Sequence, residues 1–460
     1  MIKNVFEEKT IRNANLPEAW QSQTALDELA EFLQLNWEQR AVFYEDGKIE
    51  SRQQFLTFLG QKAAKTNNYI GTIVFKGEQL NIFPKMFRLD STDDDVSELD
   101  LKHLMHNLVQ WLDYCTKIDY PYMSITSELD DSTDLRELFV TLYIRYVKNA
   151  LDRGLFYRYE EQTEDCGVIK GKVDLRDYFT RKFPNGQLDK FSCTYSNFEF
   201  DNTLNRIIKY TCKSLLNEAS KSNQKHIRHI LMKLNDVSDV RCTPHDCDTI
   251  RLSKLHKHYS IVLSMSKMFL LNKTSTYNVN NTESFCFLFP TEVLFEGFIG
   301  GFMQSVLDGA AKVVLQASDA SVFSDVIYAG HSLGKTMRMK HDILVQHKEK
   351  GLFILDTKYK KIDRFEGNPD VRSVVNDEAK SNDIYQVLTY ARTREVKDVY
   401  LLYPLFRYED IEPDNPIGIS TTVSGTEPIN VHLIRLPFVF EDDVEATKQK
   451  LAKVILSIFD

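Results

Sequence analysis

The sequence contains no uninterrupted apolar run of about 18 residues, so we expect no segment that spans a membrane. Its first residues, MIKNVFEEKTIRN, contain no apolar core of a secretory signal peptide. Cysteine is scarce, and the seven residues are scattered over the chain at positions 115, 166, 193, 212, 242, 247 and 286. A small, odd number of scattered cysteines without a signal peptide predicts reduced thiols and a cytoplasmic protein.

A surplus of positive charge is also absent, because 57 lysines and arginines face 66 acidic residues and the net charge is −9. This balance argues against a polybasic binder, although an acidic protein can carry a local basic cleft. The sequence has no internal repeat or low-complexity tract, and it lacks the G-x-S-x-G and H-E-x-x-H motifs of two hydrolase classes. The hydrophobic fraction of 43% and the charged fraction of 27% are typical of globular domains, and the length allows about two to four of them.

The order of the patterns predicts an α+β multidomain protein with three regions. Residues 1–120 are expected to form a β-rich N-terminal domain, with a hairpin at Lys76-Gly77-Glu78 and an acidic loop or linker at 91–100. Residues 121–284 are expected to form a helical middle domain with a β insert near residues 167–175. Residues 285–460 mix strands with helices and are expected to form an α/β domain.

Apolar spacing locates individual elements within these regions. In the middle region it predicts helices at about 132–154, 204–215 and 224–236. In the C-terminal region it predicts a helix after Pro290-Thr291, strands at 312–316, 341–346, 352–358, 398–403 and 431–436, and helices at 378–393 and 443–458.

The most informative segment runs from His341 to Lys360. Two apolar runs are joined by the polar turn Lys348-Glu-Lys-Gly351, which predicts a β-hairpin. Because side chains alternate along a strand, Asp356 and Lys358 are expected on one face, and the hairpin can bring Asp342 across from them. Two carboxylates and one ammonium group would then meet at one place.

This combination of charges predicts a metal site. Two carboxylates about 4 Å apart repel by roughly 4 kcal/mol at an effective dielectric constant near 20, and a hard divalent cation removes that cost. Mg²⁺ prefers oxygen ligands and keeps several waters, so two carboxylates and a substrate phosphate suffice. Such an ion can activate water for attack on phosphorus, and Lys358 can orient that water or neutralise the transition state. We therefore predict Asp342 and Asp356 as catalytic metal ligands, with Lys358 as the catalytic cation.

An Asp-x-Lys pair on a strand is more often part of a solvated surface. Here, however, Asp356 follows the apolar run Leu352-Phe-Ile-Leu355, where a buried charge needs a partner or a metal. Gln386 and Tyr390 are four residues apart, so on a helix both can point at the hairpin, although an ordinary amphipathic helix explains this pair as well. Glu296 is a candidate third metal ligand. The alternative interpretation is that Glu296 is an ordinary surface residue beside a phenylalanine-rich face.

The charge around this hairpin differs from that of the whole chain. Residues 331–364 contain nine bases and four acids, including Lys335, Asp363 and Arg364, within a chain of net charge −9. Binding of a nucleic-acid backbone needs such a local excess of positive charge, although a run of charges is more often a solvated surface.

At these residues the sequence resembles the McrC family, the nuclease subunit of McrBC-type restriction systems. Six segments carry the resemblance: Asn81-Ile-Phe-Pro-Lys85, Gly167-Val-Ile-Lys-Gly171, Phe200-Asp-Asn-Thr-Leu-Asn-Arg-Ile-Ile-Lys209, Phe295-Glu-Gly-Phe298, Leu355-Asp-Thr-Lys-Tyr-Lys360 and Asp383-Ile-Tyr-Gln386. The last two together are the most specific.

The resemblance implies a PD-(D/E)xK nuclease fold in residues 285–460, with Asp342, Asp356 and Lys358 as catalytic residues and Gln386 placing substrate or lysine. It implies an Mg²⁺-dependent endonuclease that cuts double-stranded DNA, and a partner, an McrB-like AAA+ GTPase hexamer, that binds the GTP. The N-terminal and middle regions would dock on the partner and stimulate its GTPase. Basic residues of the middle β insert, Lys170, Lys172 and Arg176, are candidates for this stimulation, although ordinary surface residues are the default explanation. His341 stands where the motif usually has proline; proline there shapes the strand, so the assignment of Asp342 is kept.

Three other interpretations remain open. Ala329-Gly-His-Ser-Leu-Gly-Lys-Thr336 fits a relaxed P-loop, but Lys335 is followed directly by a strand pattern where a P-loop needs a helix. Cys242 and Cys247, followed by His256 and His258, fit a loose zinc pattern that ordinary loop and helix residues explain better. The third is a non-catalytic assembly or activator subunit with a decayed nuclease fold, against which the intact Asp342…Asp356-x-Lys358 argues.

Overall fold

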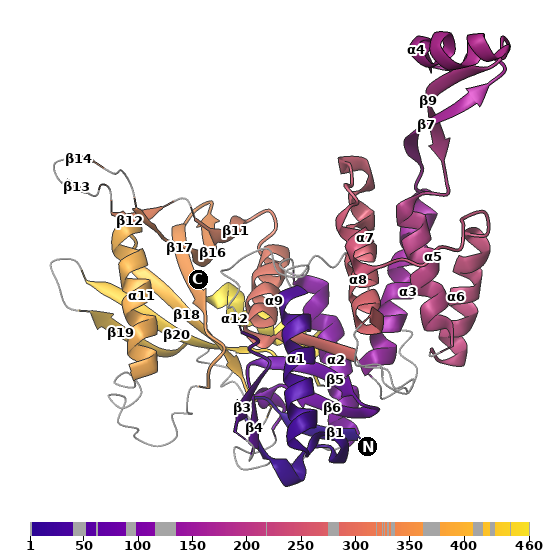
Figure 1. Cartoon of the computed structure of the whole chain (residues 1–460). Helices are drawn as coiled ribbons and strands as arrows, with labels where there is room; N and C mark the ends of the chain where they lie inside the picture. Colours follow the sequence, from indigo (N-terminus) through magenta and orange to yellow (C-terminus); the bar gives the residue numbers. More distant parts are fainter. Residues whose placement is uncertain are drawn as a thin grey trace. The chain divides into compact units, whose positions relative to one another are not determined.

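In this computed structural model the chain divides into two compact units, Met1–Leu135 together with Tyr277–Asp460, and Arg136–Thr276 (Figure 1). The structure describes residues 2–39, 52–60, 63–88, 98–115, 135–217, 219–274, 285–318, 320–323, 325, 327–328, 331–332, 336–361, 378–407, 417–423, 428–441 and 443–459. Residues 91–97 of the predicted acidic loop at 91–100 lie outside these ranges, as do Lys335, Asp363 and Arg364. Residues 98–100 are not a loop but begin helix α2 (Glu98–Tyr114).

The N-terminal part of the first unit is built on a four-stranded sheet in the order β1 (Ile2–Phe6), β6 (Glu78–Phe83), β5 (Tyr69–Phe75) and β10 (Phe285–Pro290). The predicted hairpin is confirmed, since β5 and β6 pair in antiparallel fashion around residues 76 and 77. Strand β10, which pairs with β5, arrives from more than 200 residues further along the chain. The N-terminal and C-terminal regions therefore share a sheet.

Helix α1 (Gln23–Gln39) and a second sheet complete this part. That sheet has three short strands in the order β2 (Thr10–Arg12), β4 (Ala63–Thr66) and β3 (Leu56–Leu59). Trp20, Phe32 and Trp37 are fully buried in one core with apolar residues of β5 and β6.

Helices α2 (Glu98–Tyr114) and α9 (Thr291–Val306) pack closely, and two glycines explain how. A Cβ atom on Gly297 would lie 2.2 Å from the sulfur of Cys115, and one on Gly301 would lie 1.8 Å from the carbonyl oxygen of Tyr114. Because both approaches exclude any larger side chain, the glycine of the Phe295-Glu-Gly-Phe298 segment serves packing.

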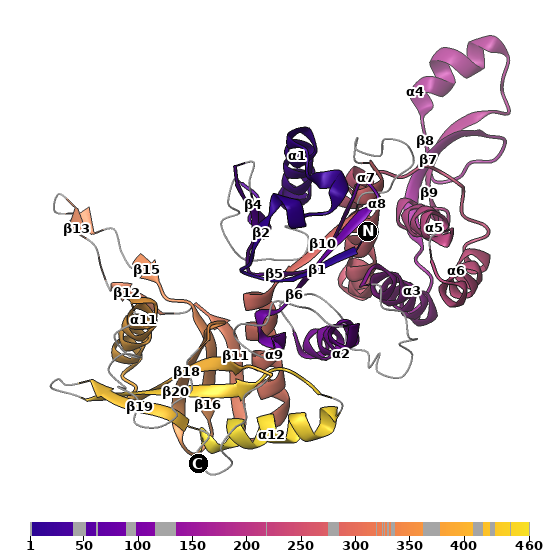
Figure 2. The ribbon, with the colours of Figure 1, turned by 90° about the horizontal axis from the view of Figure 1, so that it is seen from below.

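The C-terminal part contains a six-stranded sheet (Figure 2). Its strands follow the order β11 (Ala311–Ala317), β16 (His341–His347), β17 (Gly351–Thr357), β18 (Asp398–Leu405), β20 (Ile429–Pro437) and β19 (Ile417–Val423). Strands β17, β18 and β20 are parallel, whereas β11, β16 and β19 pair in antiparallel fashion. Helix α11 (Glu378–Arg394) packs against one face, and α9 and α12 (Val444–Ser457) lie against the other.

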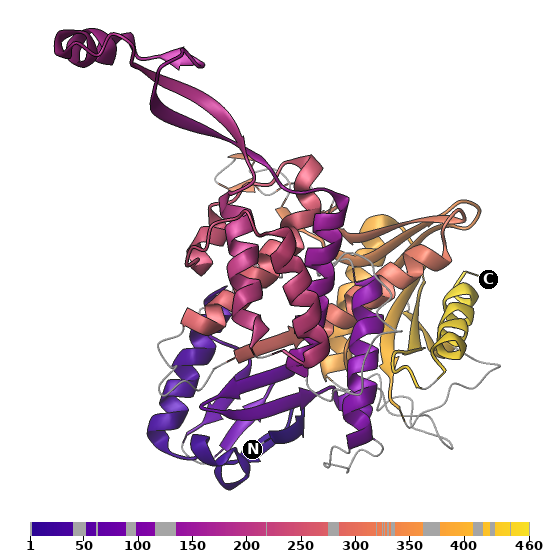
Figure 3. The same ribbon diagram turned by 90° about the vertical axis from the view of Figure 1, so that its right-hand side faces the viewer.

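The second unit is helical and carries a long β arm. Its helices are α3 (Leu135–Arg153), α5 (Thr203–Leu216), α6 (Lys221–Lys233), α7 (Pro244–Asp248) and α8 (Ser260–Thr274). The arm consists of β7 (Arg158–Cys166) and β9 (Phe191–Glu199), which pair over nine residues each and lead away from the helices of their own unit (Figure 3). Its tip holds β8 (Lys172–Val173), the short helix α4 (Leu175–Asp177) and further helical turns to residue 185.

Most predicted elements are confirmed with shifts of a few residues at their ends. The β insert differs, because residues 167–171 form the turn at the tip while the long strands lie on either side of it. Strand β19 was not predicted either. The structure has two compact units, and the predicted division into three regions at residues 120 and 284 stays a prediction.

All seven cysteines are buried as free thiols. Within the described ranges, no helix is both long and apolar enough to cross a membrane.

Candidate active site

Asp342 and Asp356 face each other on neighbouring strands. The antiparallel register of β16 and β17 pairs Ile343 with Leu355, so Asp342 lies directly opposite Asp356, one position further. Opposite residues of an antiparallel pair place their side chains on the same face, with Cβ atoms about 4.5–5.5 Å apart. The predicted meeting of the two carboxylates is thus what the sheet register produces.

The two carboxylates have different surroundings. Asp342 is half-buried, and its Oδ2 accepts hydrogen bonds from the backbone N–H and the hydroxyl of Thr357, both at 2.9 Å. Asp356 is 1% exposed, and its Oδ1 has no hydrogen-bond partner among the described residues. A buried carboxylate oxygen without a donor is costly, and a cation is the group that removes this cost.

Burial and the neighbouring Asp342 carboxylate raise the pKa of Asp356 to about 7, against the opposing effect of Lys358. Lys358 Nζ lies 2.5 Å from Asp356 Oδ2. Burial by itself would lower the pKa of Lys358, but Asp356 and Asp342 outweigh it and raise the pKa, so the side chain stays an ammonium ion. Two carboxylates against one ammonium group leave a negative site that suits a divalent cation.

Helix α11 connects to both lysines of the Leu355–Lys360 segment. Lys358 Nζ donates to Gln386 Oε1 at 3.1 Å, and Lys360 Nζ donates to both oxygens of Asp383 at 3.0 Å. Asp383 and Gln386 are three residues apart on one helical face, which matches the two-residue spacing of the lysines on the strand. This pairing explains why the two most specific segments of the resemblance occur together.

Gln386 is itself held in place. Its Nε2 donates to the hydroxyl of Tyr390 at 2.7 Å, and that hydroxyl donates to the carbonyl of Lys340 at 3.0 Å. The amide oxygen of Gln386 is thereby oriented toward Lys358. The prediction that Gln386 and Tyr390 point together at the hairpin is confirmed in position.

Glu296 has a different environment. Its Oε1 accepts a hydrogen bond from Gln316 Nε2, and Gln316 lies on β11 between Leu315 and Ala317, which pair with Ile343 and His341 of β16. In the part of the chain that is described, no three His, Cys, Asp or Glu side chains are grouped to hold a metal ion. Asp342, Asp356 and Glu296 therefore do not form a three-carboxylate group, and a role of Glu296 as ligand stays a prediction.

A depression lies on the sheet beside the carboxylates. It has a volume of about 410 Å³, and its lining includes Leu344 and Gln346, which share a strand face with Asp342. Lys312, Val314, Ala317, Ser318 and Leu352 line the rest. The depression therefore lies on the same face of the sheet as Asp342.

Among the described residues, the structure does not show the geometry that a P-loop or a zinc site requires. Thr336–Arg338 form strand β15, which pairs with β12 (Ser321–Phe323), so the helix that a P-loop needs after Lys335 is not there. Residues 333–335 themselves lie outside the described ranges. Cys242 and Cys247 are buried in an apolar cluster with Ile207 and Leu270, a setting typical of core thiols.

Comparison with known proteins identifies the family to which the chain belongs. A family model described as "McrBC 5-methylcytosine restriction system component" matches residues 64–404, which is well over half of the chain. The chain belongs to this family. A comparison with curated proteins finds no significant match.

A solved structure shows a shared fold for this McrBC-family chain. It resembles a chain of the refined half-complex from the tetradecameric assembly of Thermococcus gammatolerans McrB AAA+ hexamers with bound McrC, with a TM-score of 0.65 and 15% identity over 100% of both chains. A chain of the cryo-EM structure of the Thermococcus gammatolerans McrBC complex matches with a TM-score of 0.46 and 17% identity, over 67% of this chain and 88% of that one.

The arm of the McrBC-family chain has an apolar tip. Six large apolar side chains there are more than half exposed: Val168, Ile169, Leu175, Phe179, Phe183 and Leu188. Gly171, at φ +65°, turns the chain where a Cβ atom would lie 2.6 Å from the carbonyl oxygen of Thr194. Exposed apolar groups gathered on one small structure are typical of a protein-binding surface.

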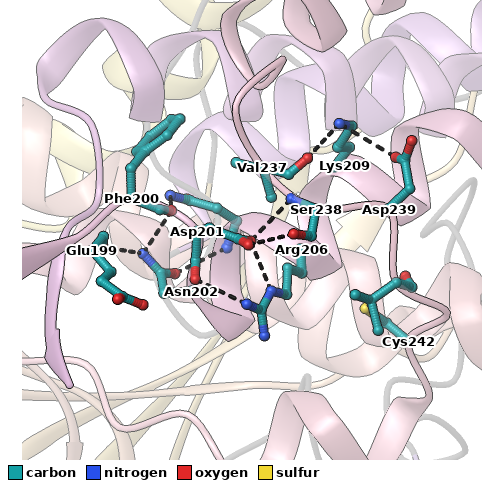
Figure 4. Close-up of polar contacts among 12 residues, drawn as sticks. Glu199, Phe200, Asp201, Asn202, Arg206, Lys209, Val237, Ser238, Asp239 and Cys242 are labelled. Atoms are coloured by element: carbon teal, nitrogen blue, oxygen red, sulfur yellow. Dashed lines mark hydrogen bonds and ion pairs between the residues drawn. The ribbon is translucent and has the colours of Figure 1, made fainter. Parts of the chain in front are cut away.

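The base of the arm is fixed by the Phe200–Lys209 segment (Figure 4). The Asp201 carboxylate accepts hydrogen bonds from Arg206 Nε at 2.7 Å and from the backbone N–H and hydroxyl of Ser238 at 3.0 and 2.5 Å. Asn202 caps α5 through Asn205 N–H and donates to the carbonyl of Phe156 at 3.0 Å. Lys209 Nζ donates to the carbonyl of Val237 at 2.5 Å and lies 3.3 Å from Asp239. The sequence predicts the helix in this segment and the resemblance that it carries, but not these contacts, which hold β9 on the helices.

Proposed function

We propose that this chain is the Mg²⁺-dependent endonuclease subunit of an McrBC-type restriction complex, with a PD-(D/E)xK-type nuclease in residues 285–460. The supporting observation is the buried Asp356, placed opposite Asp342 in the sheet register and paired with Lys358, with one oxygen that lacks a donor. The proposed substrate is double-stranded DNA.

In the proposed mechanism each residue of the site has a different role in phosphodiester hydrolysis. Asp342 and Asp356 would hold Mg²⁺, which when bound makes water more acidic and draws negative charge from the phosphate. Lys358, held by Gln386, would orient the attacking water or neutralise charge that develops on the phosphate oxygens. Thr357 would keep Asp342 in place through its two hydrogen bonds.

An McrB-like AAA+ GTPase hexamer is the proposed partner, and GTP would bind to that partner. The support is family membership together with the exposed apolar tip of the arm, which gives a docking surface. The basic residues Lys170, Lys172 and Arg176 surround this tip and remain the candidates for stimulating the partner's GTPase. Because the positive charge around the nuclease site is modest, the isolated chain is expected to cut DNA poorly.

The decisive experiment compares Asp356→Ala with Asp308→Ala, an exposed aspartate of the same unit, in complexes with an McrB-like AAA+ partner. With DNA, GTP and Mg²⁺, we expect Asp356→Ala to lose at least about 100-fold in cleavage while GTPase stimulation is unchanged. Asp308→Ala should cut like the wild type. Cleavage that survives in Asp356→Ala would show that the site is wrongly assigned. A wild-type complex that stimulates GTP hydrolysis but never cuts DNA would favour the non-catalytic activator.

A further inference from the structure

The end of β1 places a carboxylate in the interior of the first unit. Glu7 is 0% exposed, and its two oxygens accept hydrogen bonds from three separate segments. The donors are the backbone N–H of Lys85 at 3.0 Å, the hydroxyl of Thr291 at 2.7 Å and the hydroxyl of Tyr359 at 2.5 Å. Since a buried carboxylate is costly without donors, these contacts fix the three segments around one point.

Two further charged residues, Lys85 and Glu8, belong to the cluster around Glu7. Lys85 Nζ lies 2.7 Å from Glu8 and stacks over the ring of Tyr359 at 4.8 Å from its centre. Glu8 adopts a left-handed backbone conformation, with φ of 60°, which a residue other than glycine rarely takes. Lys85 closes the Asn81–Lys85 segment, whose role the proposed nuclease mechanism leaves unexplained.

Tyr359 links this cluster to the active site. It directly follows Lys358, whose backbone N–H extends the sheet by donating to the carbonyl of Leu402 at 2.8 Å. The chain turns immediately afterwards, because the N–H of Lys360 donates to the carbonyl of Lys358 at 2.9 Å. Lys358 meets Gln386 of α11, whereas the ring of Tyr359 contacts Phe295 of α9 and Phe438, so the two side chains point to different faces of the sheet.

We propose that Glu7 is a positioning residue for the nuclease site: by holding the Tyr359 hydroxyl from the opposite side of the strand, it fixes the backbone that carries Lys358. Thr291, on the same carboxylate, opens helix α9, which carries Glu296. A single group of the N-terminal strand thus orders two segments of the C-terminal part, 352 residues away in the case of Tyr359. This inference rests on the proposed nuclease function.

The test uses Tyr359→Phe, Glu7→Leu, which removes both acceptor oxygens of Glu7, and the double variant in the complex with the AAA+ partner. The matched control is Asn4→Ala, which removes the hydrogen bond from Asn81 to Asn4 between β6 and β1 but does not reach Tyr359. Both single variants are expected to lower kcat for DNA cleavage about tenfold with an unchanged KM for DNA, since a misplaced cation affects the chemical step. The double variant should be no more than about twofold worse than either single one, because all three lose the same contact.

A second readout needs no cleavage. Hydrogen exchange of the peptide that covers residues 357–360, measured without metal, should become faster in both single variants and stay unchanged in Asn4→Ala. A kcat for Tyr359→Phe within twofold of the wild type, or multiplicative effects in the double variant, would overturn the proposal. If the wild-type complex does not cut DNA at all, the nuclease function fails, and unchanged exchange at residues 357–360 would separately overturn the positioning role.

Discussion

Asp342 and Asp356 lie opposite each other on adjacent antiparallel strands, and the burial of Asp356 beside a second carboxylate raises its pKa to about 7. The ionised form of Asp356 therefore destabilises the folded protein when no cation is bound. The divalent cation of the proposed mechanism would offset this cost.

The first prediction concerns Asp356→Asn in metal-free protein. Because the folded-state pKa of about 7 exceeds the ordinary 3.8, the stabilising contribution is complete below the ordinary value and is lost as the pH rises through 7. Above pH 7 the variant should melt at least about 2 °C higher than the wild type, with a smaller difference at pH 5. Thermal unfolding between pH 5 and 8.5 measures this; a difference that does not change with pH would contradict it.

The second prediction concerns Gln386→Leu. This change removes the acceptor that holds Lys358 Nζ and leaves the ammonium group tied to Asp356 alone among its described partners. We expect kcat for DNA cleavage to fall about tenfold, with little change in melting temperature. Thr389→Ala, on the exposed side of the same helix, is the control and should cut normally. Equal kcat values for the two variants would remove Gln386 from the site.

The third prediction concerns the arm. Phe179→Ser combined with Phe183→Ser makes the tip polar without touching the paired strands β7 and β9. Stimulation of the partner's GTPase should fall at least about tenfold, because the buried apolar area of the proposed interface is lost. Leu255→Ser, an equally exposed apolar residue elsewhere in this unit, provides the control. Normal stimulation by the double serine variant would show that the tip does not dock.

The fourth prediction concerns the base of the arm. Asp201→Ala removes the carboxylate that accepts from Arg206 Nε and from the Ser238 N–H, and it should lower the free energy of unfolding of its unit by about 2 kcal/mol. Asp239→Ala, which breaks more exposed ion pairs with Lys209 and Lys213, should cost less than about 1 kcal/mol. Denaturant titration compares the two, and equal losses would refute the distinction.

The fifth prediction concerns the pH dependence of the stability that Asp201 gives to its unit. Its hydrogen bonds from Arg206 and Ser238 hold the pKa of the carboxyl well below its ordinary value. The stability that they provide is therefore present above the ordinary pKa and is lost as the pH falls below it. The difference in stability between wild type and Asp201→Ala should shrink in acid, which the same titration at low pH checks.

Several elements followed directly from the sequence because their signals are local. The phenylalanines at 285, 287 and 289 alternate and form β10, and the apolar spacing around 204–215 forms α5. The strand β7, with the sequence RYEEQTEDC, shows no apolar alternation and was missed. Continuous hydrogen-bonded pairing with β9 stabilises this strand, and no local sequence pattern indicates that pairing.

The sequence by itself determined which residues could carry the chemistry: an aspartate that ends an apolar strand, a lysine two residues later and a second aspartate before the turn. Only the tertiary structure decided the register that sets Asp342 against Asp356, the reach of Gln386 and Asp383 to the two lysines, and the contact of Glu7 with Tyr359. The reason is physical. Periodicity within a strand or helix depends on neighbours along the chain, whereas register and burial depend on side chains that meet only when distant segments pack.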